Sequence, residues 1–136
     1  MSRPIAAHNG KPYDIRERLF MFACDIVNAS QKLHTRGPIA GELSLQLVKA
    51  AVSAASNAAE ADDASSDRDF RAKERICLRE IKEARLRLRV LHAAGFIDAS
   101  ALVRESDELV RIVSTIIRNN ARRDAERTGR ALPSTT

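Results

Sequence analysis

The stretch 47-LVKAAVSAASNAAEADD-63 decides the fold, because it combines many alanines with a helical spacing of apolar residues. Alanine has the highest helix propensity of the amino acids. From Pro38 onward, apolar residues recur at helical spacing, mostly in steps of three or four, at Leu43, Leu47, Ala50, Ala51, Ala54, Ala58 and Ala61. This segment is therefore predicted to be a helix whose small side chains let neighbouring helices approach closely, and not a flexible spacer.

Three further segments have the same periodicity. The first begins near residue 14, and its apolar stripe is Ile15, Leu19, Phe22, Ile26 and Leu33. The next runs from about residue 67 to 94, with Ser66 as its N-cap and Gly95 at its end. The last begins near Asp98 or Ser100, either of which can cap it. Four amphipathic helices with short connections predict an all-α fold, an antiparallel up-down-up-down four-helix bundle.

The bundle is expected to be one domain at residues 14–123. Residues 1–13 contain two prolines and a glycine, which predict a flexible N-terminal segment. Residues 124–136 are polar and are predicted to form a flexible basic C-terminal tail.

The overall charge is compatible with an acidic partner. The 136 residues include 23 basic and 18 acidic side chains, a net charge of +5. Such a balance suits nucleic acid, although many ordinary proteins share it. No segment reaches the roughly 18 apolar residues of a membrane span, and the first residues lack the apolar middle of a secretion signal. We therefore expect a cytoplasmic protein without a membrane partner, in which Cys24 and Cys77 are reduced and buried.

A basic stripe on the third predicted helix is the main functional signal. Placed at about 100° per residue, seven basic residues fall within one arc of roughly 120°. They are Arg68, Arg71, Arg75, Arg79, Lys82, Arg85 and Arg89. The stripe predicts contacts to phosphate groups, since no aromatic residues interleave with it for base stacking. A solvated face with pairs between neighbouring charges is the alternative.

Two further surfaces are predicted. Arg118, Arg122 and Arg123 extend the expected nucleic-acid contacts toward the C-terminal end, where a plain soluble tail is the alternative. A second set of apolar residues lies off the core face of the third helix and outside its basic arc. A helix with two apolar faces is usually buried on both, so we expect an oligomer interface there, although scattered exposed apolar residues need no explanation. The interface residues are Ile76, Leu86 and Val90, with a similar contact at Phe20 and Val27.

The sequence does not favour an enzyme. It contains no HExxH, P-loop, GxSxG or GxGxxG motif, and its three histidines have no metal-ligand spacing. The acidic run from Glu60 to Asp69 lacks the spacing and the glycine of an EF-hand. We expect no catalytic residues, no cofactor and no metal site, and a bundle that binds a divalent cation or a small molecule near Glu60 is the weaker alternative.

The run 46-QLVKAAVSAASNAAEA-61 resembles the signature of a bacterial four-helix bundle family encoded in intervening sequences of large-subunit ribosomal RNA genes. That signature is roughly Q-[IL]-R-R-A-A-x-S-I-P-x-N-I-A-E-G. The matching residues are Gln46, Leu47, Lys49, Ala50, Ala51, Ser53, Asn57, Ala59 and Glu60. The segment 95-GFID-98 is similar to a later motif of the family, G-Y-L-[ST]. Ala55 and Ala61 depart from the signature, where proline and glycine are usual.

This resemblance implies a homopentamer, often with a basic surface. It also implies a relation to the accessory protein of diversity-generating retroelements, which works with a reverse transcriptase and RNA. It brings no catalytic residues. Asn57 and Glu60 are expected to be structural polar residues that bond to another helix or to a helix end.

The favoured hypothesis is a non-enzymatic oligomeric bundle that binds nucleic acid, with structured RNA preferred. The alternative is a protein–protein scaffold, or an accessory subunit of a reverse transcriptase or ribonucleoprotein.

Overall fold

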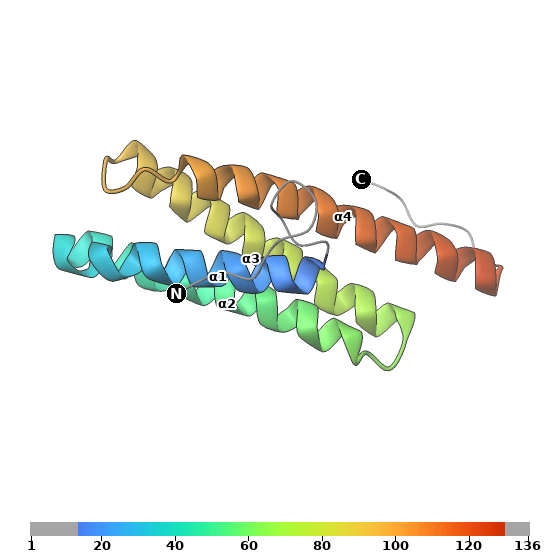
Figure 1. Cartoon of the computed structure of the whole chain (residues 1–136). Coiled ribbons are helices and arrows are strands. Elements are labelled where there is room, and N and C mark those ends of the chain that lie inside the picture. Colours follow the sequence, from blue (N-terminus) through green and yellow to red (C-terminus); the bar gives the residue numbers. More distant parts are fainter. Residues whose placement is uncertain (1–13, 130–136) are drawn as a thin grey trace.

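The computed structural model describes residues 14–129, which form four long helices and one short 3-10 helix (Figure 1). Helix α1 spans Ile15–Leu33 and is followed by η1 at His34–Arg36. Helices α2, α3 and α4 span Pro38–Asp62, Asp67–Ala93 and Ser100–Thr128. Consecutive helices run in opposite directions, which confirms the predicted up-down-up-down bundle. Residues 1–13 and 130–136, which hold the predicted N-terminal segment and most of the predicted tail, lie outside the described residues.

Local sequence sets the start of α2 and both ends of α3 where they were expected, whereas the N-cap of α4 is Ala99 and not the predicted Asp98 or Ser100. Gly37 has a φ of 110°, a conformation that favours glycine, and Pro38 then occupies the first turn of α2. The Ser66 hydroxyl accepts a hydrogen bond from the backbone N–H of Asp69 at 3.0 Å, which caps α3. Gly95, with a φ of 82°, follows the last turn of α3.

The alanine-rich stretch forms the core face of α2. Leu47, Ala51 and Ala54 are fully buried and belong to the same hydrophobic core cluster. Helices α2 and α3 share the largest helix–helix contact in the bundle, where α3 contributes Cys77 and Ile81 to the core. Because each alanine presents a single methyl group, the two backbones can approach closely, as predicted.

Helix α4 continues to Thr128, so the predicted boundary at residue 123 is wrong by five residues. Asp124 is buried, and its carboxylate lies 3.0 Å from Nη2 of Arg71 on α3 and 2.8 Å from Nη2 of Arg127. Ala125 is buried beside it. This polar segment stays helical because the buried Asp124 carboxylate is paired with Arg71 of another helix, which apolar periodicity cannot reveal.

A buried ion pair joins α1 to α4. Arg18 is almost inaccessible to solvent, and its guanidinium donates to both carboxylate oxygens of Glu105, at 2.8 and 3.2 Å. Glu108 lies 3.3 Å from the same group. Bidentate pairs of this kind fix geometry as well as charge, so they set the height of α1 against α4. Among the described helices, none has the length and apolar character of a membrane span.

Candidate nucleic-acid interface

The outer side of α3 carries five of the seven residues of the predicted basic stripe. Their side chains are exposed, and they recur at intervals of three, four or seven residues, so they share one side of the helix. They are Arg68, Arg75, Arg79, Lys82 and Arg89. Their side of α3 lies opposite the buried face that contains Cys77, Ile81 and Leu88.

The other two predicted residues face α4. Arg71 donates to Oδ1 of Asn120 at 2.8 Å and forms the 3.0 Å ion pair with Asp124. Arg85 donates to Oδ1 of Asp107 at 3.2 Å. Both side chains are partly buried, so their geometry favours a structural role, holding α3 against α4, over contact with a phosphate.

A second row of exposed arginines follows α4. Arg104, Arg111 and Arg118 are seven residues apart, and Arg122 follows one turn later. Seven residues are close to two full helical turns, so these side chains lie on one side of α4. The predicted Arg123 is also exposed, but it points about 100° away from Arg122.

The two rows are in register. The contact between Arg85 and Asp107 shows which residues of these antiparallel helices lie at the same height. Moving along α3 in one direction and along α4 in the other from this contact gives three level pairs, that is, pairs of basic residues at the same height to within one residue. They are Arg89 with Arg104, Lys82 with Arg111, and Arg75 with Arg118, which together are called the basic ladder. Successive pairs are separated by about 10.5 Å along the helices, at ~1.5 Å per residue.

The ladder carries positive charge with few acidic groups nearby, although the charge of Asp98 interacts with that of Arg104. Across residues 14–129, none of its six side chains forms an ion pair; Arg118 donates a hydrogen bond to the Thr115 hydroxyl. By contrast, Arg87 pairs with Glu83 at 2.5 Å. Helix α4 has no aromatic residue and α3 has only the half-buried Phe70, so this surface offers phosphate contacts without a platform for stacking bases.

The two predicted structural polar residues differ in their partners. The amide Nδ2 of Asn57 donates to the backbone carbonyl of Ser53 at 2.9 Å, within its own helix, so the expected bond to another helix is wrong for this residue. A helical side chain reaches the carbonyl four residues back more easily than a neighbouring helix. Glu60 does bridge two helices, since its Oε1 lies 3.5 Å from Nζ of Lys73 on α3.

The predicted interface residues lie on opposite sides of the bundle. Phe20 and Val27 belong to α1, on the side that borders α2, whereas Leu86 and Val90 project from α3. Leu86 is 54% exposed and follows Lys82 by one helical turn, so it shares the side of the basic stripe and does not form the separate face expected from the helical wheel. The fifth residue, Ile76, is half-buried.

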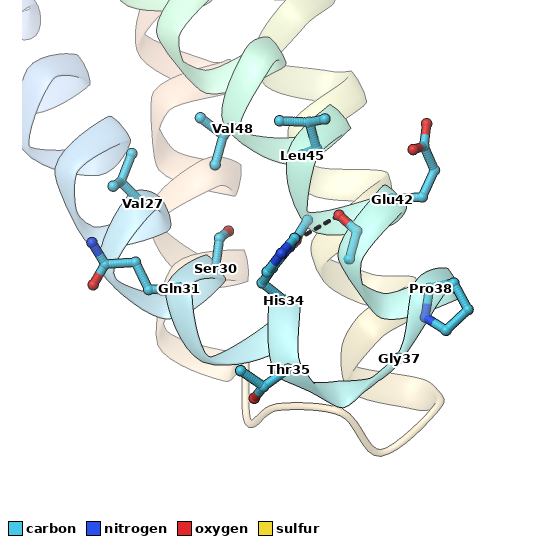
Figure 2. A pocket seen from close by; sticks show the side chains of 12 residues that line it. Val27, Ser30, Gln31, His34, Thr35, Gly37, Pro38, Glu42, Leu45 and Val48 are labelled. Atoms are coloured by element: carbon cyan, nitrogen blue, oxygen red, sulfur yellow. Dashed lines mark hydrogen bonds between the residues drawn. The ribbon is translucent and has the colours of Figure 1, made fainter.

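A hollow of about 680 Å³ opens between α1 and α2 beside η1 (Figure 2). Figure 2 shows Val27 and Ser30 on the α1 side, across from Leu45 and Val48 on α2. Leu45 and Val52 are exposed, and neither was predicted as an interface residue. Their spacing of seven residues was the available signal, but it is hidden among the alanines of the same helix.

A buried carboxyl group was also missed. Glu74 on α3 is almost fully buried, and its Oε1 has no hydrogen-bond partner among residues 14–129. Burial raises the pKa of Glu74 to about 7, the charge of Asp62 adds to this effect, and Arg16 opposes it. Burial, together with Glu74, raises the pKa of the Cys77 thiol to about 12, so this cysteine is a poor nucleophile. The described residues contain no cluster of three or more side chains suited to holding a metal ion.

Comparison with known proteins gives one family and one informative structure. The model of the family described as 23S rRNA-intervening sequence protein matches residues 11–118. A crystal structure at 1.70 Å resolution, from Bacteroides thetaiotaomicron VPI-5482, is described as a protein with unknown function from the S23 ribosomal protein family. It is 25% identical to this chain, with a TM-score of 0.72, and the match covers 77% of this chain and 99% of that one. Comparison with curated proteins gives no match.

Proposed function

Since the chain belongs to the 23S rRNA-intervening sequence protein family, we propose that it is a non-enzymatic, self-associating bundle that binds structured RNA. The observation that carries this proposal is the basic ladder on the outer side of α3 and α4. The family description connects its members with ribosomal RNA sequences, which agrees with an RNA ligand.

The ladder suits the phosphate backbone of a folded RNA. Its six cations are held on two helices of 27 and 29 residues, and they are exposed to solvent and form no ion pair among residues 14–129. Each phosphate that such a cation neutralises releases a condensed counterion, so affinity should fall steeply with salt. Double-stranded RNA is recognised mostly by shape and by backbone contacts, which need neither aromatic platforms nor base-reading side chains. An RNA ligand also fits the expected cytoplasmic location.

Fluorescence anisotropy with a labelled RNA hairpin tests the proposal. We expect binding at ~50 mM salt, weaker binding of a single strand with the same composition, and a negative slope of log affinity against log salt. The double variant Arg75→Glu and Arg118→Glu, which reverses one level pair, should reduce the magnitude of that slope by about 2. A wild-type chain that ignores the hairpin at low salt would contradict the proposal.

A protein–protein scaffold, or an accessory subunit of an enzyme such as a reverse transcriptase, is the second candidate. It is favoured by the exposed apolar side chains, which include Phe20, Leu45, Val52, Leu86 and Val90. A protein partner captured from nuclease-treated extract at fixed stoichiometry would favour it, provided that the hairpin does not bind. Self-association, for which the resemblance implies a homopentamer, is common to both candidates.

A further inference from the structure

The exposed apolar side chains form two separate faces. One lies on the outer side of α1 and α2 and surrounds the hollow of Figure 2. The other lies on the outer side of α3, beside α4. We propose that these two faces bind each other between neighbouring copies of this chain, so that the groove between α1 and α2 receives Leu86 and Val90 of the next copy. This rests on the self-association proposed above and specifies which surfaces meet.

The receiving face is an apolar strip on two antiparallel helices. Val27 lies across from Leu45 in the hollow. Phe20 and Val52, each seven residues further from the α1–α2 connection, continue the strip at the next level. Leu45 is 51% exposed and Phe20 is 56% exposed, although both are large apolar residues. Ser30 is buried at the edge of the groove, and its hydroxyl has no hydrogen-bond partner among residues 14–129. An apolar strip over two helical turns is the kind of surface that accepts another helix.

The inserted face also lies next to a hollow. Leu86 and Val90 are one helical turn apart, and with Val103 of α4 they border a space of about 640 Å³. Arg89 and Arg104, one level pair of the basic ladder, line the same space. Two aliphatic side chains flanked by two arginines require an apolar partner with acidic groups at its rim.

The receiving face meets this requirement. Among the side chains that line the α1–α2 groove, the one permanently charged residue is Glu42, which is exposed. The net charges of the two halves of the bundle have the same signs as the two faces. Residues 14–63 carry five basic and seven acidic side chains, whereas residues 66–128 carry fifteen basic and eleven acidic ones. Opposite charges on the two faces favour contact between unlike faces and oppose contact between like ones.

The position of the two faces allows a ring. The α1–α2 and α3–α4 connections lie at the same end of the bundle (Figure 1), so both hollows lie at a similar height on opposite sides. Copies related by rotation about an axis roughly parallel to the helices could therefore join unlike faces repeatedly. Contacts between unlike faces close into a ring when the rotation permits. Lys82 with Arg111 and Arg75 with Arg118, the two ladder pairs farther from this end, would stay accessible to RNA.

Two interface variants and their mixture test the proposal by analytical ultracentrifugation. Leu45→Glu breaks the receiving face, and Leu86→Glu breaks the inserted face. We expect an oligomer for the wild-type chain and monomers of 15.0 kDa for each variant. An equimolar mixture should form a dimer and nothing larger, because it contains one intact receiving face and one intact inserted face. Ile39→Glu is the matched control, since Ile39 is 70% exposed but borders neither hollow, and it should leave the oligomer unchanged.

The outcomes separate this inference from the proposals on which it rests. A monomeric wild-type chain overturns both self-association and the inference, whereas RNA binding is measured independently. A wild-type oligomer that survives Leu45→Glu or Leu86→Glu overturns the inference alone. A mixture that stays monomeric, with both variants shown by circular dichroism to be folded, also overturns it, because it excludes contact between unlike faces.

A charge exchange gives a second readout. Glu42→Arg and Arg89→Glu should each weaken self-association about tenfold or more, and the double variant should recover most of the loss. If self-association of the double variant is as weak as that of the single variants, these two residues do not pair.

Discussion

Helices α2 and α3 pack against each other more extensively than any other pair, yet their sequences are opposite in character. Helix α2 is rich in alanine and has one basic residue, Lys49, whereas α3 has nine. In α2, a small side chain decides how close the neighbour comes. In α3, arginine has different roles according to the direction in which its side chain points. Arginines that face a neighbouring helix are paired with acceptors, whereas those that face solvent have no ion-pair partner, or only a distant one, within residues 14–129.

Arg71 and Arg75 should respond very differently to the same substitution. Arg71→Ala removes one partner of the buried Asp124 carboxylate, so the free energy of unfolding should fall by about 3 kcal/mol, the low end of the range for breaking a buried pair, because Arg127 remains. Arg75→Ala, one turn away on the exposed side, should change it by less than about 0.5 kcal/mol. Urea denaturation of both variants measures the difference. Equal losses of stability in the two variants would contradict the structural role assigned to Arg71 and the solvent-facing role assigned to Arg75.

Glu74 should make stability depend on pH in a defined direction. Its folded pKa of about 7 lies above the ordinary value of 4.5, so the folded state holds the proton more tightly than the unfolded state. Stability from this group is therefore fully present below about pH 4.5 and is lost as pH rises to about 7. The loss is at most about 3 kcal/mol.

The substitution Glu74→Gln should remove this loss and make the protein more stable than wild type above pH 7, as measured by denaturation at several pH values. Glu126→Gln serves as the control, because Glu126 is exposed on α4. An unchanged difference between wild type and Glu74→Gln across this pH range would contradict a raised pKa.

The alanine face of α2 should tolerate no enlargement. Ala54 is fully buried, so Ala54→Leu should lower the free energy of unfolding by about 2 kcal/mol through overpacking. Ala59 is exposed on the same helix, and Ala59→Leu should be nearly neutral. Thermal unfolding of the two variants checks the contrast, and a neutral Ala54→Leu would mean that close packing does not depend on the alanines.

The sequence predicted the fold well because the fold depends on local signals. The alanines of α2, the Ser66 cap and Gly95 each act within a few residues of their position. The end of α4 was placed too early because its stability comes from Asp124 and Arg71, which are 53 positions apart in the chain. No periodicity of apolar residues reports such a pair.

The candidate site was only partly predictable for the same reason. A helical wheel gives the angle of a residue, so it identified the exposed Arg75 and Lys82, but it also included Arg71 and Arg85, whose partners belong to α4. The register of the ladder needs the relative height of two helices, which only the folded chain supplies. The α1 part of the apolar α1–α2 face, Phe20 and Val27, was predicted, but Leu45 and Val52 on α2 were not, because the face is shared between two helices.

The most direct test of the account compares two charge reversals of equal size. Lys82→Glu with Arg111→Glu removes one level pair of the basic ladder, and Lys32→Glu with Lys49→Glu removes two exposed lysines from α1 and α2. The measurement is the salt dependence of hairpin RNA affinity for both variants. We predict that the ladder variant loses affinity and that the magnitude of its slope falls by about 2, while the control keeps the wild-type slope. Equal losses in both variants would contradict the claim that RNA binds the α3–α4 face, because net charge alone would then explain the binding.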